Sequence, residues 1–218
     1  MTSEEDALLA VALGADAIGF IFASGSARQV TPEKVKQIVS RLPHGVVTVG
    51  VFRDERPERV VETVNSIGLA GAQVHGREPI SEVRWIRKRV QFVIQGFAAG
   101  DPAVAAAANG PADVVLIDSS EPGSGQVFDW SLADGAPGGV RLLVAGGLTP
   151  DNVAAAIARV RPWGVDVATG VESAPGRKDP RKLRRFIDIA RTAGAELGEN
   201  GWREADGVEP YDWEIEER

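Results

Sequence analysis

The chain contains no cysteine, and it has only two histidines, His44 and His75, among its 218 residues. Without cysteine, these residues cannot form a disulfide framework, a cysteine zinc site or a cysteine nucleophile. No group of acidic side chains stands at metal-ligand spacing, and two histidines do not make up for that. We therefore expect no bound metal.

Long apolar runs are also missing. No stretch approaches the roughly 20 residues that span a bilayer, and the N-terminus lacks the basic and apolar pattern of a secretory leader. We expect a cytoplasmic chain without a membrane partner.

Lysine is scarce, and no lysine stands at the C-terminal end of an apolar run, which argues against a Schiff-base aldolase. The five lysines are Lys34, Lys36, Lys88, Lys178 and Lys182.

The net charge of −7 is concentrated at one end of the chain. Residues 196–218 hold nine acids and two bases, whereas the rest of the chain holds 22 of each. A balanced body argues against nucleic acid as a partner. The sequence predicts one domain over residues 1–195 and an acidic C-terminal tail over 196–218.

Seven apolar runs, each followed by a helix-like segment, organise the body. Such alternation is typical of βα units with a parallel sheet, and the length fits one (β/α)8 barrel. The runs are Ala15–Phe22, Val46–Phe52, Leu69–His75, Gln91–Phe97, Asp113–Asp118, Arg141–Ala145 and Gly164–Thr169.

A helix opens the chain before any strand. Ser3 is a typical N-cap with acidic residues behind it, and Gly14 ends the pattern. Other helix starts are expected at Thr31, at Thr149 to Asp151, and at Asp179. Seven strands cannot close an eight-stranded barrel, so the fold predicted is a TIM (β/α)8 barrel whose first strand is absent from these residues, with a gap between two edges.

Two glycine-containing loops follow the last two runs. Glycine lets backbone amides approach an anion, so the pair predicts a phosphate site, although such glycines can also serve tight turns alone. The residues concerned are Gly146, Gly147, Thr169 and Gly170.

Polar residues follow other strands. Asp118, after four apolar residues, suits a proton donor whose pKa is raised by burial, or else it caps the next turn. Arg28 could bind an anionic or aromatic group, or stay solvated. His75, with Gln73 nearby, could titrate or hydrogen-bond at the site, or be a structural core residue. The loop Gly123–Gly125 could fold over a ligand or merely connect two elements.

The ordered motifs resemble the phosphoribosylanthranilate isomerase family of tryptophan biosynthesis over roughly residues 2–192. They are GADAIGFIF (14–22), Arg28 within 26–30, VGVF (49–52), QVHG (73–76), LIDS (116–119), GSG (123–125) with FDW (128–130), AGGLTPDNV (145–153) and GVDVATGVESAPGRKD (164–179).

The resemblance implies an isomerase that performs an Amadori rearrangement of a phosphorylated small molecule without cofactor or metal. Asp118 matches the family's general acid, which protonates the ribose ring oxygen. Arg28 matches the arginine that holds the anthranilate end, and Asp166 matches a position near the same group. Gly146, Gly147, Thr169 and Gly170 match the phosphate cradle. The sequence does not indicate an oligomeric state.

One departure from the family is serious. The family's general base is a cysteine in a KICG segment that ends the first strand, and here Met1 and Thr2 stand where the residues after that cysteine would be. Two hypotheses follow: an isomerase whose first strand and base lie upstream, or a non-catalytic barrel that binds a phosphorylated ligand or a partner. A related barrel that also accepts the histidine-pathway aldosylamine would prefer paired aspartates at two strand ends.

Overall fold

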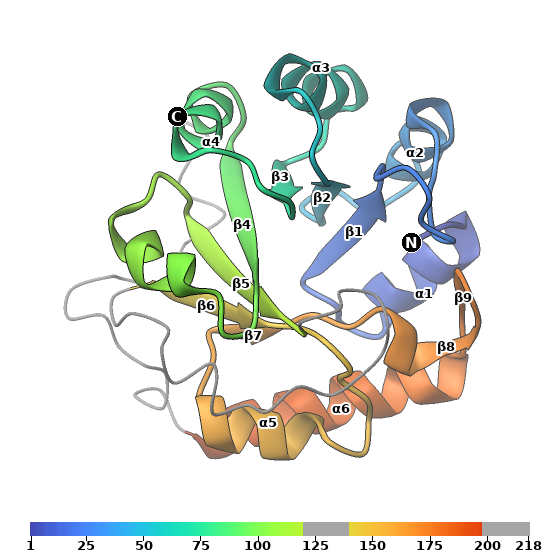
Figure 1. Cartoon of the computed structure of the whole chain (residues 1–218). Helices are drawn as coiled ribbons and strands as arrows, with labels where there is room; N and C mark the ends of the chain where they lie inside the picture. The colour runs from blue at the N-terminus through green and yellow to red at the C-terminus, as the bar shows by residue number, and fades with distance from the viewer. Residues whose placement is uncertain (120–139, 198–218) are drawn as a thin grey trace.

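The computed structural model describes residues 1–119 and 140–197 (Figure 1). The loop Gly123–Gly125, the FDW motif at 128–130 and most of the predicted tail lie outside these residues.

All seven predicted strands are present, and they form one parallel sheet in chain order. Each is somewhat shorter than, or offset by a residue from, the apolar run that predicted it. The strands are β1 (Ala17–Ile21), β2 (Val47–Phe52), β3 (Gly71–Val74), β4 (Phe92–Ala98), β5 (Val114–Asp118), β6 (Arg141–Val144) and β7 (Gly164–Val165).

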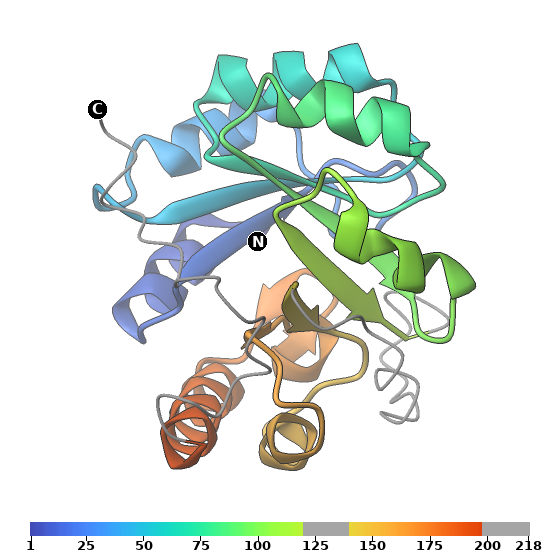
Figure 2. The ribbon, with the colours of Figure 1, turned by 90° about the vertical axis from the view of Figure 1, so that its left-hand side faces the viewer.

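The sheet curls on itself but does not close, as expected (Figure 2). Among residues 1–119 and 140–197, β1 pairs only with β2 and β7 pairs only with β6. Met1 lies beside the β1 edge, where its amino nitrogen donates to the Gly19 carbonyl. The fold is thus an α/β barrel of the TIM type with an opening between β1 and β7.

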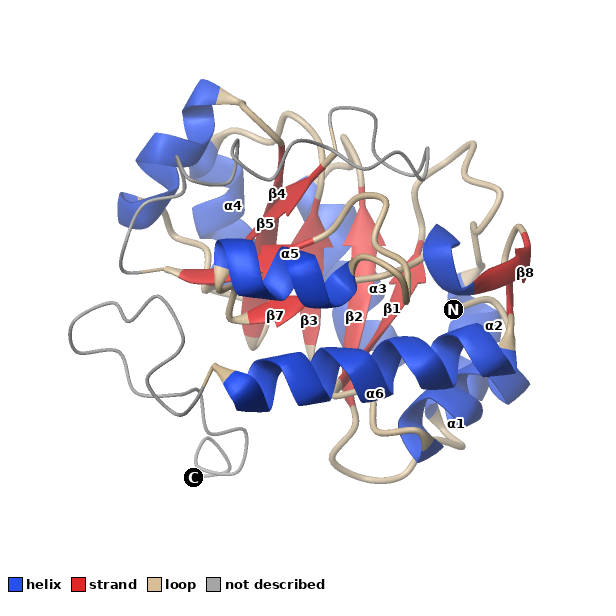
Figure 3. Cartoon of the chain, turned by 90° about the horizontal axis from the view of Figure 1, so that it is seen from below, coloured by secondary structure: helices blue, strands red, loops and turns tan. Residues whose placement is uncertain are grey.

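Helices cover the outside of the curled sheet, and α6 runs along it next to α5 (Figure 3). A short antiparallel hairpin lies between β7 and α6. The elements are α1 (Glu4–Ala12), α2 (Pro32–Val39), α3 (Pro57–Ile67), α4 (Ile80–Arg87), η1 (Pro102–Asn109), α5 (Val153–Val160), η3 (Thr169–Val171), β8 (Glu172–Ala174), β9 (Arg177–Lys178) and α6 (Pro180–Glu196).

Three of the four predicted helix starts are confirmed. The side chains of Ser3, Thr31 and Asp179 each accept a backbone N–H of the first turn. The start at Thr149 is wrong, because α5 begins only at Val153. Asn152 instead ties the preceding loop together: its Oδ1 accepts from Thr149 N at 2.8 Å, and its Nδ2 donates to the Gly147 carbonyl at 3.0 Å.

Both faces of the strands are buried, which explains why the runs are continuously apolar. In β5, Val114 and Leu116 point into the barrel interior, whereas Val115 and Ile117 pack against the outer helices. Each fully buried Val, Leu or Ile contributes about 1.5–3 kcal/mol relative to exposure. The packed interior fixes the strand ends and therefore the side chains that follow them.

The first helix is fastened to the last part of the chain. Asp6 Oδ2 accepts from Lys178 N at 3.1 Å, across 172 positions of sequence. Arg191 donates to Asp16 Oδ1 at 2.9 Å, and the Thr2 hydroxyl donates to the Gly176 carbonyl. These contacts hold α1 against the hairpin and α6.

Candidate active site

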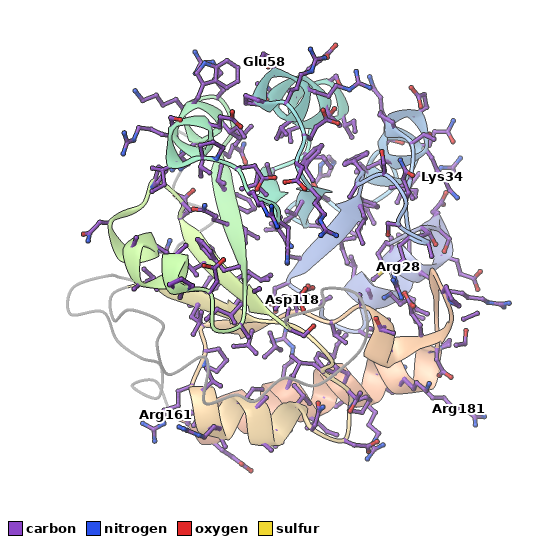
Figure 4. All side chains as sticks on the ribbon, in the orientation of Figure 1. Arg28, Lys34, Glu58, Asp118, Arg161 and Arg181 are labelled. Carbon is purple, nitrogen blue, oxygen red and sulfur yellow. The ribbon has the colours of Figure 1, made fainter. Side chains whose placement is uncertain are left out.

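The C-terminal ends of the parallel strands meet at one rim, here called the mouth. Asp118 ends β5, while His75 and Asp166 directly follow β3 and β7. In Figure 4, Asp118 lies near the centre of the ring of elements and Arg28 lies toward the β8–β9 hairpin. Lys34, Glu58, Arg161 and Arg181 are at the periphery in the same view. The predicted residues therefore come together at the mouth.

Asp118 uses its two carboxyl oxygens differently. Oδ1 accepts from the Ser119 amide at 2.7 Å, so the carboxyl does cap the following turn. Oδ2 faces the mouth and lies 3.6 Å from His75 Nε2. Burial raises the pKa of Asp118, and the hydrogen bonds from Ser119 only partly oppose this. A carboxyl of this kind retains its proton to higher pH and can donate it.

The loop after β6 approaches Asp118 as closely as backbone can. Gly146 and Gly147 have φ values of +82° and +66°, which favour glycine. A Cβ on Gly146 would lie 2.3 Å from Ser119 N and 2.7 Å from Asp118 Oδ1. The glycine at 146 is therefore required both by the turn and by the neighbouring strand end.

The loop after β7 packs against the loop after β6. A Cβ on Gly170 would lie 1.8 Å from the Leu148 carbonyl oxygen, so no larger residue fits there. Thr169 opens the short η3 turn, and its hydroxyl lies 3.4 Å from Arg28 Nη2, which donates to it. The two predicted phosphate loops thus form one continuous backbone surface.

Arg28 is not a solvated loop residue. Its Nε and Nη2 donate to the two oxygens of Glu172 at 2.8 and 2.7 Å, and the two side chains are 15% and 5% exposed. Burial disfavours the Glu172 carboxylate, but the Arg28 hydrogen bonds and the nearby cations outweigh it and lower the pKa. The arginine is held in one place by a partner 144 positions away.

Lys178 reaches the mouth although, as predicted, it does not stand at the end of a strand run. Its side chain is 7% exposed, and Nζ donates to the Ala168 carbonyl at 2.9 Å beside Glu172 Oε1 at 3.5 Å. Burial lowers its pKa, while Glu172 and Asp166 act in the opposite direction. Lys178 was missed because it lies on the hairpin and not at the end of a strand run, and no spacing rule links it to Glu172.

Asp166 lies at the open side of the mouth, after β7. Desolvation by the surrounding strand ends raises its pKa, as does the charge of Asp118, whereas Lys178 and His75 act against the rise. The side chain is nevertheless exposed to solvent. Water screens it and weakens the upward shift.

The mouth, rather than the outer surface, holds the candidate chemistry. A hollow of about 340 Å³ lies between α1 and α6, lined by Leu9, Ile189 and the start of α6. Its lining includes neither Asp118 nor the glycine loops. Within residues 1–119 and 140–197 no cluster of three potential metal ligands occurs, and no helix there is long and apolar enough to cross a membrane.

Comparison with known proteins identifies the family. Residues 1–189 match the family model described as N-(5'phosphoribosyl)anthranilate (PRA) isomerase. A relative named N-(5'-phosphoribosyl)anthranilate isomerase from Pelobacter propionicus is 40% identical over 200 residues, covering 90% of this chain and 95% of the relative.

Solved structures agree with the match. The phosphoribosyl anthranilate isomerase of Thermus thermophilus superposes with a TM-score of 0.83 at 39% identity, covering 88% of this chain and 96% of that one. A second isomerase, in complex with reduced 1-(o-carboxyphenylamino)-1-deoxyribulose 5-phosphate, has a TM-score of 0.78 at 36% identity, covering 88% and 95%. The chain belongs to the N-(5'-phosphoribosyl)anthranilate isomerase family.

Proposed function

We propose that this chain works as the isomerase of tryptophan biosynthesis that converts N-(5-phosphoribosyl)anthranilate into 1-(2-carboxyphenylamino)-1-deoxyribulose 5-phosphate, with Asp118 as its proton donor. The observation that carries the proposal is the shared mouth: the buried Asp118 carboxyl contacts Gly146 of one glycine loop, and that loop contacts the other. A phosphorylated sugar bound to the loops would lie beside the acid.

The substrate has two anionic ends, and the mouth offers a separate site for each. We assign the phosphate to the backbone of Gly146, Gly147, Thr169 and Gly170. We assign the anthranilate end to Arg28 with Asp166 nearby. Glu172 engages Nε and Nη2 of Arg28, so Nη1 remains for a substrate carboxylate.

The first step is ring opening. Asp118 gives its proton to the ribose ring oxygen as the bond from that oxygen to the anomeric carbon breaks, and the nitrogen lone pair forms the iminium bond. A base then takes the proton from the adjacent carbon, and the resulting enol becomes the ketone. Apart from the carbon–oxygen bond that breaks, every step is a proton transfer, and one carbon is reduced as its neighbour is oxidised, so the chemistry calls for no redox cofactor.

One observation favours a second candidate function. The family's base is a cysteine, and the 218 residues contain none. A barrel without a base would bind the phosphorylated ligand without converting it. The two functions make different predictions for a chain to which a base is supplied.

The test compares the 218-residue chain with the same chain extended at its N-terminus by an apolar strand ending in Lys-Ile-Cys-Gly. The strand would fit the opening between β1 and β7. We expect both chains to bind reduced 1-(o-carboxyphenylamino)-1-deoxyribulose 5-phosphate. Turnover should be about 10²–10⁴-fold higher in the extended chain, the usual contribution of a general base.

A matched control replaces the cysteine of the extension by serine, which keeps the strand and removes the base. If the cysteine chain folds and binds but converts nothing, the binding function is correct. If the 218-residue chain already matches the extended one, the account of the base is wrong.

The domain bounds, the location and the partner class rest on the composition and pattern of the sequence. We propose that residues 1–195 form the catalytic domain, that 196–218 form an appended acidic tail, and that the protein acts in the cytoplasm on a small molecule and not on nucleic acid or a membrane.

A further inference from the structure

His75 has a buried ring nitrogen that makes no hydrogen bond within the described residues. Its Nε2 atom is buried and has no hydrogen-bond partner in the part of the chain that the structure describes. An unpaired buried polar atom costs about 1–3 kcal/mol, and such atoms are uncommon in native proteins. The atom lies at the mouth, so its partner is to be sought there.

The neighbouring glutamine determines which ring nitrogen carries the hydrogen. Gln73 Nε2 lies 3.3 Å from His75 Nδ1. In this orientation of the Gln73 amide its nitrogen donates to Nδ1, which places the hydrogen of a neutral ring on Nε2. Burial lowers the pKa of His75 and keeps the ring neutral; Asp166 and Glu78 act in the opposite direction, and Arg53 reinforces the lowering.

The Nε2–H group faces the free oxygen of Asp118. The separation from Oδ2 is 3.6 Å, which is too long for a hydrogen bond, and a movement of about 0.6 Å would complete one. The ring packs on Gly96 of β4, where a Cβ would lie 2.6 Å from Nδ1. Gln73 and Gly96 therefore hold the ring in the orientation that aims Nε2 at Asp118.

We propose that His75 is the positioning residue of the acid: its neutral Nε2–H donates to Asp118 Oδ2 and stabilises the carboxylate that forms when the proton leaves. This inference rests on the proposed function. In ring opening, the Oδ2–H bond breaks, the proton goes to the ribose ring oxygen, and the bonding electrons stay on Oδ2. His75 keeps its own proton throughout.

The other charges around the pair make such a donor useful. The charge of Asp118 raises the pKa of Asp166, after β7, so the two carboxylates repel each other. Ser119 donates to Oδ1 only. Lys178 on β9 acts on Asp166 and is occupied by Ala168 and Glu172. His75 supplies the donor that points at the oxygen losing the proton.

The first experiment needs no turnover and uses the 218-residue chain. Nitrogen-15 NMR of the imidazole ring reports the tautomer, and carbon-13 NMR of the Asp118 carboxyl reports its titration. We expect the Nε2–H tautomer in the wild type. We expect His75→Phe, which fills the space without a donor, to increase the proton affinity of Asp118 about tenfold, the size of one hydrogen bond to a charged group.

Matched variants separate positioning from packing. His75→Gln restores an N–H donor and should keep the proton affinity of Asp118 near the wild-type value, including where His75→Phe fails to fold. Gln73→Leu removes the group that fixes the tautomer and should give a mixture of the two forms. His44→Phe changes the other histidine, which is exposed, and should change nothing.

The second experiment uses the extended chain with its cysteine. His75→Phe should lower kcat about tenfold, leave KM nearly unchanged, and move the high-pH limb of the kcat profile upward, because the acid holds its proton longer. A merely structural residue would lower activity at every pH without moving that limb.

Three results would overturn the proposal: hydrogen on Nδ1, an unchanged Asp118 titration in His75→Phe, or no rescue by His75→Gln. If the NMR shifts occur while the extended chain makes no product, the proposed function fails and the contact between His75 and Asp118 stands.

Discussion

Beside Asp118 the mouth is made of backbone, and beyond that backbone, after the loop that follows β7, it is made of buried charge. The glycine flank consists of Gly146, Gly147 and Gly170, which take unusual φ angles or leave no room for a Cβ. The charged flank consists of Arg28, Glu172 and Lys178, which are nearly enclosed and hold one another in place. We assign the phosphate to the first and the carboxylate end of the substrate to the second.

The two flanks make opposite demands on a sequence. Backbone amides can approach an anion wherever no side chain stands in the way, so a glycine loop can bind phosphate with its own residues alone. A buried ion pair needs a partner with matching position and charge, because an unpaired charge in a protein interior is costly. Substitutions in the glycine flank should therefore destabilise the protein by steric crowding. Substitutions in the charged flank should destabilise it by leaving a buried charge without its partner.

The largest effect is expected at Asp118 itself. In the cysteine-extended chain, Asp118→Asn should lower turnover about 10²–10⁴-fold and leave binding of the reduced product analogue largely intact, since the amide keeps the shape and loses the proton. Steady-state kinetics and calorimetry would measure the two quantities. Unchanged turnover would place the proton donor elsewhere.

The same substitution should stabilise the fold. The folded pKa of Asp118 lies above its unfolded value because of burial, so the ionised side chain destabilises the native state as pH rises through that interval. Asp118→Asn should accordingly melt at a higher temperature than the wild type at pH 7. The difference in melting temperature should disappear below about pH 3.8, the ordinary pKa of an aspartate side chain.

Crowding the glycine flank should cost stability. Gly170→Ala places a Cβ 1.8 Å from a backbone oxygen, and we expect about 1–3 kcal/mol of destabilisation or more, together with weaker phosphate binding. Gly194→Ala is the control, because it lies in α6 with nothing within 4 Å and should be stabilising by about 0.5–1 kcal/mol. Chemical denaturation of both variants measures the change in the free energy of unfolding. An equal change in the two would mean that a Cβ at position 170 does not crowd the glycine flank.

Removing one partner of the buried ion pairs should destabilise the charged flank. Glu172→Gln removes the negative charge shared by Arg28 and Lys178, and we expect about 3 kcal/mol of destabilisation at pH 7. The folded pKa of Glu172 is lowered, so its contribution is present above the unfolded pKa and is lost as pH falls through the folded one. The difference in the free energy of unfolding between Glu172→Gln and the wild type should thus become smaller at acidic pH. Glu58→Gln, at the periphery, serves as the control.

Arg28 tests whether the charged flank binds the carboxylate end of the substrate while the glycine flank binds the phosphate. Arg28→Ala should weaken binding of the reduced product analogue about 10–100-fold, as expected for hydrogen bonds to a charged group, and should weaken inorganic phosphate much less. Titration calorimetry with the two ligands measures both affinities. Equal losses would mean that Arg28 does not belong to the carboxylate end.

The smallest effect is expected outside both flanks. Removing residues 199–218 should leave a cooperative melting transition and unchanged ligand affinity, because an acidic segment with little periodic apolar character contributes little to a core. Loss of cooperative unfolding would make the tail part of the domain.

The sequence predicted the glycine flank and missed most of the charged one, and the reason is physical. Apolar runs and glycines are local signals, so seven strands, the open sheet and the loops at 146 and 170 could be recognised. Arg28 was recognised without its partner, since Glu172 is remote in sequence. The helix start at Thr149 was wrong because its hydroxyl caps only a turn, accepting from Asp151 N at 3.2 Å, and the helix itself begins at Val153, after Asn152.

Fastening the first helix to the last hairpin also sets an order of events during synthesis. The hydrogen bond between Asp6 and Lys178 cannot form until nearly the whole barrel has left the ribosome. Contacts between distant positions form slowly, because a long loop must close first. Helix α1 is therefore made long before it is secured, and a nascent chain halted before residue 178 would present α1 without this anchor to any chaperone or protease nearby.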